Sequence, residues 1–233
     1  MKIPIWSRPS VGNPEEETLS DFQLFIGNKN YSSWSFRPWI GLKQAGIPFT
    51  EELVPFDFKN GNPAFRPFSP TMKVPVLKDG SLTVWESLAI LEYAADVFPD
   101  AGLWPGDVGL RAHARAISAE MHAGFTALRS ACPMNMRREP GRIGIDGKVQ
   151  ADIDRIVAIW RECLDRSGGP FLFGGFTIAD AMFAPVVSRF ATYLLSDDPT
   201  VATYSAAMMS LPAWIEWQEA AVQEPWTVEE EEV

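Results

Sequence analysis

Short apolar runs separated by turn-forming residues characterise the first hundred residues of the chain. Residues 22–26 (FQLFI) predict one strand and residues 49–55 predict a second. Between them, residues 39–45 predict a helix that Gly46 and Pro48 end. A strand, a helix and a strand at this short spacing form a βαβ unit, so we expect two parallel strands joined by a right-handed crossover.

A hairpin follows after a long loop. The loop at residues 56–71 is rich in Pro, Asn and Phe and is long for a connection without secondary structure, which indicates function or a short irregular helix. Apolar runs at 73–77 and 82–85 then flank the dipeptide Asp79-Gly80. This pattern predicts two antiparallel strands joined by a tight turn.

Two features beside the hairpin concern chemistry. Pro75 cannot donate a hydrogen bond to a sheet, so we expect it at the first residue of its strand or at a sheet edge. A turn forced just before the strand raises the chance of a cis bond, which would leave the Val74 backbone free to bond another group. Residues 88–95 predict a helix that Glu86 and Ser87 open, and the Ser87 hydroxyl there is either an N-cap or a ligand-binding group.

The second half of the chain is helical in pattern. Apolar residues at helical spacing predict one helix from Leu110 to Leu128 and another from Val149 to Cys163, which form an antiparallel pair in a bundle. The breaker-rich stretch at residues 98–106 marks a domain boundary. The expected division is an extension at 1–21, an α/β domain at 22–101, a helical domain at 107–223 and an acidic tail at 224–233.

A further helix begins at Thr177, with Asp180 at its third position. This spacing predicts a capping box, which favours a structural role for Asp180 over a catalytic one. Pro185 lies inside the same helix and is expected to bend it. The last helix is expected to start at residues 211–214, with a proline in its first turn.

Composition and charge exclude some classes of function. The chain has 46% hydrophobic and 21% charged residues, as an ordinary globular protein does, and a net charge of −10 that argues against nucleic acid as a partner. Acidic runs at 15–17 and 229–232 carry part of this charge, and we expect both to be solvated ends. No apolar run approaches the roughly 20 residues of a membrane span, and the first residues lack the apolar core of a signal peptide.

The cysteines and histidines offer little for redox or metal chemistry. Cys132 and Cys163 are too few and too far apart for a disulfide framework, and we expect two buried thiols, which suits a reducing cytoplasm. His113 and His122 are nine residues apart, so on one helix they face opposite sides. We therefore expect no metal site.

Ser32 and Ser33 stand between the first strand and the first helix, in the sequence NYSSWSFRP. Serine hydroxyls in this place accept hydrogen bonds from the first free N–H groups of a helix. The same helix end is an anion site, because free donors and the positive end of the helix dipole point outward. A hydroxyl that does not serve as a cap can instead hold a thiolate, and we assign this role to Ser32 or Ser33.

Four segments in this order resemble the cytosolic glutathione S-transferases, and most closely a bacterial member of their zeta-like class, the maleylacetoacetate isomerase-like enzymes. They are residues 32–35 after the first strand, residues 73–77 before the hairpin, residues 86–87 at a helix start, and residues 177–180 near the end. The resemblance covers about residues 22–223. It implies an α/β thioredoxin-like N-terminal domain followed by an all-α helical-bundle C-terminal domain.

The resemblance also implies how the thiol of glutathione is activated. Ser32 aligns with the catalytic serine of the zeta class, and Ser33 stands beside it. A free thiol titrates near pH ~8.5 and only the thiolate attacks. Lowering that pKa by two units requires about 2.7 kcal/mol. One hydrogen bond to a charged group supplies roughly 1.5–3 kcal/mol, and a helix N-terminus adds roughly 0.3–1 kcal/mol. A serine hydroxyl therefore suffices without a general base.

Five further residues bind the rest of glutathione if the resemblance holds. The Val74 backbone would bond the cysteinyl backbone, next to Pro75 in the cis form, and Lys73 is a candidate for another contact with the tripeptide. Glu86 and Ser87 would hold the γ-glutamyl end, with its carboxylate at Ser87.

The chain departs from the zeta pattern at two positions. Trp34 stands where that class has a cysteine, which removes a thiol for a disulfide mechanism. Thr192 stands where that class has an arginine for the substrate carboxylate, although Arg189 lies one turn earlier. Candidates for the second-substrate pocket are Trp34, His122, Thr126 and Arg189, of which the last three are otherwise plain helix-surface residues.

The sequence thus predicts a cytoplasmic glutathione S-transferase that acts on a small hydrophobic electrophile, with glutathione as co-substrate and without a metal. The alternatives are a zeta-type cis-trans isomerase and a non-catalytic binding module of the same fold. The intact serine turn and the Glu86-Ser87 pair favour catalysis, because a scaffold would not need both. The resemblance alone implies a homodimer.

Overall fold

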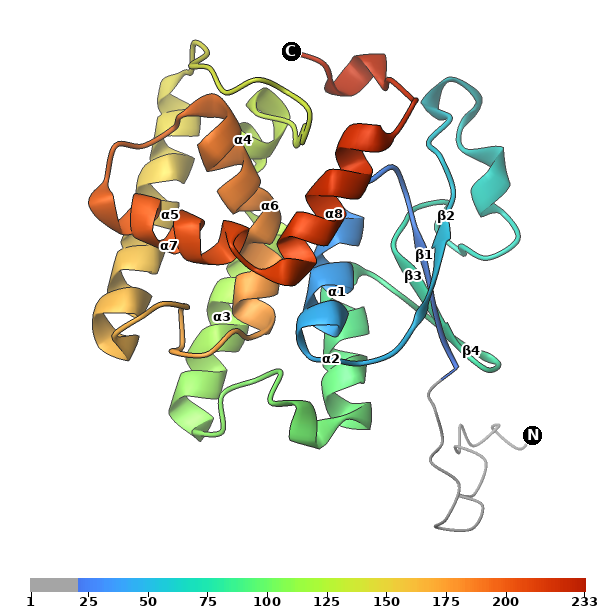
Figure 1. Ribbon diagram of the computed structural model, residues 1–233, viewed down its shortest axis with the longest axis horizontal. Coiled ribbons are helices and arrows are strands. Elements are labelled where there is room, and N and C mark those ends of the chain that lie inside the picture. Colours follow the sequence, from blue (N-terminus) through green and yellow to red (C-terminus); the bar gives the residue numbers. More distant parts are fainter. Residues whose placement is uncertain (1–20) are drawn as a thin grey trace, which may run out of the picture.

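A four-stranded mixed sheet with helices packed against it forms the first part of the molecule (Figure 1). The computed structural model describes residues 21–233. The strand order is β2-β1-β3-β4, in which β1 pairs parallel with β2 and antiparallel with β3, and β3 pairs antiparallel with β4. The strands are β1 (Phe22–Ile26), β2 (Thr50–Leu53), β3 (Val76–Asp79) and β4 (Leu82–Trp85).

The helices of the second half of the chain lie on the side of α1 and α2 that faces away from the sheet (Figure 1). The α-helices are α1 (Ser33–Gln44), α2 (Ser87–Val97), α3 (Val108–Ala123), α4 (Thr126–Ala131), α5 (Gly147–Ser167), α6 (Ile178–Tyr193), α7 (Pro199–Met209) and α8 (Pro212–Gln223). Short 3-10 helices are η1 (Phe58–Asn60), η2 (Pro63–Phe65), η3 (Pro99–Ala101) and η4 (Glu229–Glu231). The predicted fold class, an α/β first part and an all-α second part, is confirmed.

Local sequence signals predicted the strands of the sheet with some errors in their bounds. β1 and β4 have the predicted bounds, whereas β2 is shorter than the predicted 49–55 and β3 begins three residues after the predicted start at residue 73. The expected hairpin forms about Asp79-Gly80, with Gly80 and Ser81 between the two strands, and the loop at 56–71 contains the expected irregular helices η1 and η2. β3 begins directly after Pro75, and the Val74–Pro75 peptide bond is cis. The expected cis bond is therefore confirmed, whereas Pro75 lies one residue before its strand and not at the first residue or at a sheet edge.

Helix α1 differs from its prediction. It begins at Ser33, six residues before the predicted start at residue 39, and includes Pro38. The early turns form because the Phe36 ring is buried and packs on Trp214 and Trp217 of α8, with ring centroids 5.2 and 4.8 Å apart. Proline is usually found at the start of a helix, which favoured a start next to Pro38. Packing against α8, which is distant in sequence, instead extends the helix ahead of Pro38.

Two helical predictions in the second half are also corrected. The expected helix from Leu110 to Leu128 breaks after α3, because Phe125 adopts a left-handed φ of 55° and starts the separate helix α4. Helix α7 was not predicted, although Asp198 followed by Pro199 is a typical helix start: the Asp198 carboxylate accepts a hydrogen bond from the Thr200 N–H. At the start of α7, the capping aspartate and the proline favour a helix although the apolar residues that follow have only a weak helical spacing.

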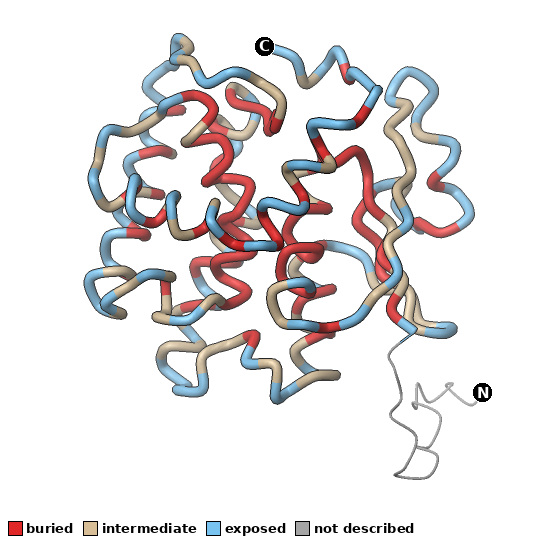
Figure 2. The backbone as a smooth tube through the Cα atoms, in the orientation of Figure 1, coloured by how far each residue is buried: buried red, intermediate tan, exposed pale blue. Residues whose placement is uncertain are grey.

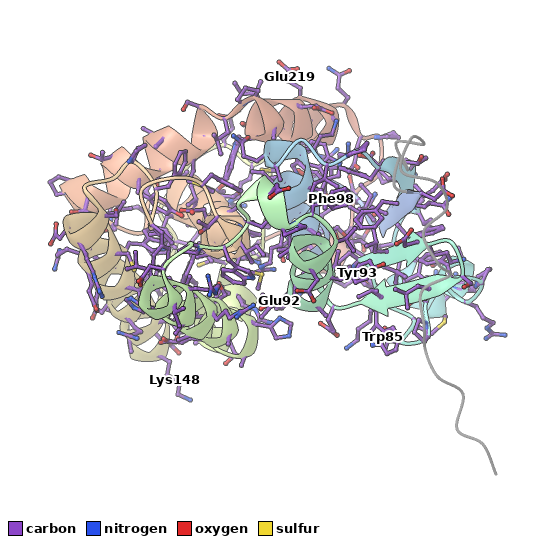
Figure 3. The ribbon with its side chains drawn as sticks, turned by 90° about the horizontal axis from the view of Figure 1, so that it is seen from below. Trp85, Glu92, Tyr93, Phe98, Lys148 and Glu219 are labelled. Atoms are coloured by element: carbon purple, nitrogen blue, oxygen red, sulfur yellow. The ribbon has the colours of Figure 1, made fainter. Side chains whose placement is uncertain are left out.

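Helix α2 packs against the sheet through aromatic residues. Tyr93 projects from α2 (Figure 3). Its ring stacks on Phe22 of β1 at 5.8 Å between centroids, and its hydroxyl donates to the Asp79 carboxylate at 2.6 Å. Phe98, after the end of α2, meets the same Phe22 ring edge-on at 5.6 Å. These contacts fix α2, and with it the Glu86-Ser87 helix start, relative to the sheet.

Helix α6 is the centre of the shared core (Figure 2). All of its residues except Ala191 are buried, and it packs against α1 on one side and α3 on the other. One continuous hydrophobic cluster runs from the sheet through α6 to Trp217 of α8. A smaller cluster under the loop contains Phe65, Phe68, Val74 and Val76. Because the large cluster spans both halves, each half is stabilised by the other.

The start of α6 is held by a buried carboxylate, as the sequence predicted. The Thr177–Asp180 capping box is present, and the Asp180 carboxylate accepts hydrogen bonds from the Thr177 N–H at 2.9 Å and the Leu172 N–H at 3.0 Å. The Tyr204 hydroxyl of α7 donates to it at 3.0 Å. Burial raises the pKa of Asp180 to about 6. Asp180 thus joins three segments of the helical part and has a structural role.

Two expectations about the ends and the thiols have different outcomes. Cys132 and Cys163 are free and buried, as predicted. The acidic run at 229–232 is only partly a solvated end: Glu229, Glu230 and Glu232 are exposed, but Glu231 is half-buried and Glu232 accepts a hydrogen bond from the Tyr31 hydroxyl at 2.6 Å. The extension expected at 1–21 and its acidic run lie almost wholly outside the described residues.

Replacing Asp180 tests its role in stability. We expect Asp180→Ala to lower the free energy of unfolding by about 3 kcal/mol or more, because buried N–H and O–H donors lose their acceptor. Urea denaturation measures this loss. The control is Asp165→Ala, which removes an exposed carboxylate from α5. Equal stability of the two variants would contradict the structural role of Asp180.

Candidate functional site

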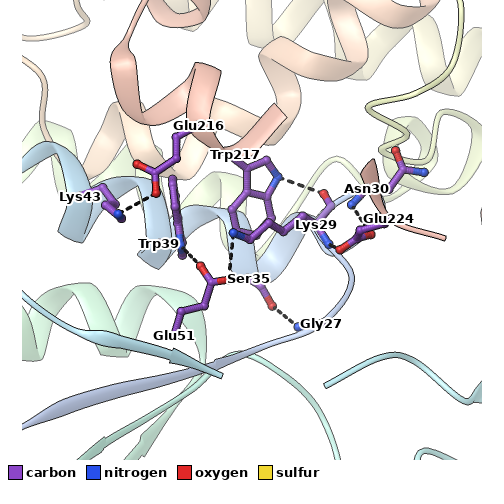
Figure 4. Close-up of polar contacts among 10 residues, drawn as sticks. All are labelled: Gly27, Lys29, Asn30, Ser35, Trp39, Lys43, Glu51, Glu216, Trp217 and Glu224. Carbon is purple, nitrogen blue, oxygen red and sulfur yellow. Dashed lines mark hydrogen bonds and ion pairs between the residues drawn. The ribbon is translucent and has the colours of Figure 1, made fainter. Parts of the chain in front are cut away.

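The turn between β1 and α1 presents the serine hydroxyls. Ser32 is the N-cap residue of α1, but among residues 21–233 its side chain caps no backbone N–H. Its hydroxyl donates instead to the Ser35 hydroxyl at 2.7 Å. The Ser35 oxygen also accepts a hydrogen bond from the Gly27 N–H at 3.2 Å, which Figure 4 shows. Ser32 is 4% exposed, and Ser33 forms the first residue of the helix. The Ser32 hydroxyl therefore does not cap the helix.

A pocket of about 210 Å³ lies beside the cis peptide bond. It is lined by residues from the serine turn, the segment before the hairpin, the start of α2, and helices α3 and α4: Trp34, Thr71, Lys73, Val74, Pro75, Glu86, His122 and Arg129. The fold thus brings together six of the residues singled out from the sequence. Ser32, Ser33, Ser87, Thr126 and Arg189 do not line this pocket.

The start of α2 carries an unused hydroxyl. Ser87 is 1% exposed, and its Oγ has no hydrogen-bond partner within the part of the chain that the structure describes. Glu86, just before it, has a left-handed φ of 72°, a conformation that costs energy for a non-glycine residue and clusters at functional sites. A buried, unpartnered hydroxyl at the N-terminus of an 11-residue helix is suited to bind a carboxylate. The N-cap role that the sequence left open for Ser87 is not observed.

Trp34 forms a wall of the pocket and is held by two arginines. The guanidinium carbons of Arg37 and Arg129 lie 4.1 and 4.8 Å from the centroid of its ring, and the His122 ring meets it edge-on at 5.2 Å. His122 also places Nε2 at 3.7 Å from a carboxylate oxygen of Glu86. His122 thus links the helical part to the start of α2.

Sequence reasoning missed both arginines. Arg37 is completely buried: its Nε donates to the Met182 carbonyl of α6 at 2.9 Å and its Nη1 to the Ser33 carbonyl at 3.1 Å. Burial, together with Arg189 and Arg129, lowers the pKa of Arg37 well below its ordinary value. The sequence carried a signal for Arg37, because a basic residue stands within the apolar sequence of α1. It carried none for Arg129, because the place of Arg129 depends on the break between α3 and α4, which was not predicted.

The other two candidates for the second substrate lie elsewhere. Thr126 is exposed at the start of α4. Arg189 is buried, with Nε donating to the Cys132 carbonyl at 2.8 Å and Nη1 to the Pro185 carbonyl at 3.1 Å. Burial lowers the pKa of Arg189 to about 10. Arg189 is therefore not a plain surface residue, and its observed contacts join α6 to the residues after α4.

Both cysteines are buried, and burial governs their chemistry. Burial raises the pKa of the Cys132 thiol to about 11 and that of Cys163 to about 12, so neither is a reactive thiolate near neutral pH. Among residues 21–233, no group of three His, Cys, Asp or Glu side chains is placed to hold a metal ion. Within the same residues, no helix combines the length and apolarity needed to cross a membrane.

Comparisons with known proteins agree with this arrangement. The glutathione S-transferase N-terminal domain matches residues 31–97 and the C-terminal domain matches residues 111–220. The chain is 30% identical over 189 residues to a probable maleylacetoacetate isomerase of Caenorhabditis elegans, an alignment that covers 79% of this chain and 87% of the relative. It is 29% identical over 191 residues to a maleylacetoacetate isomerase of Rattus norvegicus, covering 78% and 86% respectively.

A solved structure shows the same fold. A Burkholderia glutathione transferase homologue with bound glutathione superposes with a TM-score of 0.67 at 23% identity, over 87% of this chain and 98% of that chain. The two matched domains and the C. elegans relative confirm the resemblance that the sequence suggested: the chain belongs to the glutathione S-transferase family.

Proposed function

We propose that this chain is a glutathione transferase that activates the glutathione thiol through a serine hydroxyl and joins the sulfur to a small hydrophobic electrophile. The observation that carries the proposal is the buried, unpartnered Ser87 hydroxyl at the start of α2, beside a pocket that contains the Val74–Pro75 cis bond. These are the groups that would hold the γ-glutamyl end and the cysteinyl backbone of a bound tripeptide.

The γ-glutamyl end of glutathione would lie at the start of α2. Its carboxylate would accept hydrogen bonds from the Ser87 hydroxyl and the free N–H groups of the helix, whose dipole favours an anion. Its ammonium group would lie against the Glu86 carboxylate, which lines the pocket. The Val74 backbone would pair with the cysteinyl residue, and Lys73 supplies a positive charge for the glycyl carboxylate.

The sulfur would lie toward the start of α1. For the Ser32 hydroxyl to donate to a thiolate, its hydrogen turns away from Ser35, whose oxygen keeps the bond from the Gly27 N–H. A bond of this kind to a charged group is worth roughly 1.5–3 kcal/mol, close to the amount that a two-unit fall in pKa requires. The thiol proton leaves to solvent, a carbon–sulfur bond forms, and the leaving group departs with its electron pair.

A second candidate function is cis-trans isomerisation with glutathione. The names of the two relatives above favour it, and so does Arg129, a cation in the pocket that could bind an anionic substrate. The isomerase would use the same thiolate, which adds to the substrate and leaves again unchanged. A binding module without catalysis is the remaining alternative.

Replacing the two serines tests thiol activation and catalysis together. We expect the unaltered protein to be retained on immobilised glutathione and to turn over a chlorodinitrobenzene-type electrophile. We expect Ser32→Ala to raise the thiol pKa of bound glutathione by about one to two units, because the thiolate loses a charge-assisted bond. Ultraviolet titration of the thiolate measures the shift.

Ser33→Ala is the matched variant, one residue away at the same helix end. A rise in pKa in Ser33→Ala alone would assign the role to Ser33. No rise in either variant would refute the serine mechanism, and retention without turnover by the unaltered protein would favour the binding module.

Replacing Ser87 tests the carboxylate site separately. We expect Ser87→Ala to raise the KM for glutathione about tenfold while kcat changes little, because the lost bond contributes equally to the ground and transition states. Steady-state kinetics with glutathione as the varied substrate measure both constants. Ser81→Ala, in the exposed hairpin turn, is the control. An unchanged KM in Ser87→Ala would contradict the proposed site.

We also propose a cytoplasmic homodimer, as the family resemblance implies. The two buried, reduced cysteines are consistent with a reducing compartment. Sedimentation equilibrium is expected to give about twice the chain mass of 25.9 kDa, because family members pair through a two-fold interface. A mass of one chain at micromolar concentration would contradict this proposal.

A further inference from the structure

The turn that carries Ser32 is held by residues from the other end of the described chain (Figure 4). The Glu224 carboxylate, at the end of α8, accepts a hydrogen bond from the Lys29 N–H at 2.6 Å and from the Asn30 N–H at 3.1 Å. Trp217 of α8 donates through its indole N–H to the Lys29 carbonyl at 3.0 Å. Glu224 is only 8% exposed, so this carboxylate is committed to two successive amides of the turn.

The segment after α4 holds the middle of the same turn. The Asn30 side chain donates to the Asn135 side-chain oxygen at 3.0 Å and accepts from the Arg137 N–H at 2.9 Å. The Asn30 carbonyl accepts from the Met136 N–H at 3.3 Å. Asn30 is fully buried, and both its backbone and its side chain are fixed by this segment.

Arg137 connects these two sets of contacts. Its guanidinium donates to the Glu224 carbonyl at 2.7 Å, to the Trp226 carbonyl at 2.7 Å, and to the Tyr31 hydroxyl at 2.8 Å. The Tyr31 hydroxyl in turn donates to the Glu232 carboxylate at 2.6 Å. Residues 224–232 therefore run across the turn and are attached to it at both ends.

We propose that residues 224–232, fastened by Arg137, form a strap that positions the serine turn for thiol activation. This inference rests on the proposed function. Ser32 follows Tyr31 directly, and among residues 21–233 its own N–H bonds only within the turn, to the Asn28 carbonyl at 2.7 Å. Its place relative to a bound sulfur is thus set by how firmly the turn is held, and a displacement of about 1 Å is enough to weaken such a bond.

The strap residues are positioning residues, since none of them lines the pocket beside Pro75 and the hydrogen bonds given above join them to the turn and to the segment after α4. A merely structural strap would affect the stability of the fold, whereas a positioning strap also sets the thiol pKa of bound glutathione. These two consequences can be measured separately, because Glu224 does not line the pocket beside Pro75.

Glu224→Gln is the sharpest variant. A glutamine has the same shape, but its amide group accepts hydrogen bonds at one end only, so one of the two turn N–H groups loses its acceptor. The control is Glu230→Gln, which removes the same charge from an exposed position on the same segment. The readouts are ultraviolet titration of bound glutathione and hydrogen exchange of the turn amides in the ligand-free protein.

We expect the Lys29 and Asn30 amides of Glu224→Gln to exchange at least about tenfold faster than in the unaltered protein and in the control. We expect the thiol pKa of its bound glutathione to rise by about half a unit or more. Faster exchange with an unchanged thiol pKa would overturn the positioning role, and unchanged exchange would overturn the strap itself.

Tyr31→Phe is the second variant, for use if Glu224→Gln does not fold. It removes the hydroxyl that joins the turn to Glu232 and Arg137, and the same two readouts apply with the same criteria. If the unaltered protein does not bind glutathione, the proposed function fails, and hydrogen exchange alone decides whether residues 224–232 hold the turn.

Discussion

The turn at residues 27–32 is almost entirely buried, and burial requires each of its backbone polar groups to find a partner. No single neighbouring element supplies these partners. The Phe56 N–H pairs with the Asn28 side chain at 2.8 Å, while Lys29 and Asn30 bond to Glu224 and to residues 135–137. The turn is therefore completed only when the loop after β2, the helical part and residues 224–232 are all in place.

The two halves of the molecule also share one core. Helix α6 fills the space between α1 and α3, and the fully buried Arg37 of α1 bonds to its Met182 carbonyl. Arg37 also lies against Trp34, which lines the pocket. The packing that joins the halves and the geometry of the pocket thus depend on the same side chains.

The sequence predicted what is determined locally and missed what is determined by distant contacts. The bounds of β1, the hairpin about Asp79-Gly80, the cis bond before Pro75 and the Thr177–Asp180 capping box follow from a few adjacent residues. The early start of α1 depends on α8, the position of Arg129 depends on a left-handed residue between α3 and α4, and the strap depends on Arg137. None of these has a periodic signature, because each is the result of tertiary packing.

The central claim is that a serine hydroxyl at the start of α1 holds the sulfur of glutathione whose γ-glutamyl carboxylate lies at Ser87. A crystal structure of the glutathione complex tests it most directly. The account predicts the sulfur within hydrogen-bond distance of the Ser32 or Ser33 oxygen, and the carboxylate on the now unpartnered Ser87 hydroxyl. A sulfur remote from both serines, with Ser32 still bonded to Ser35, would contradict it.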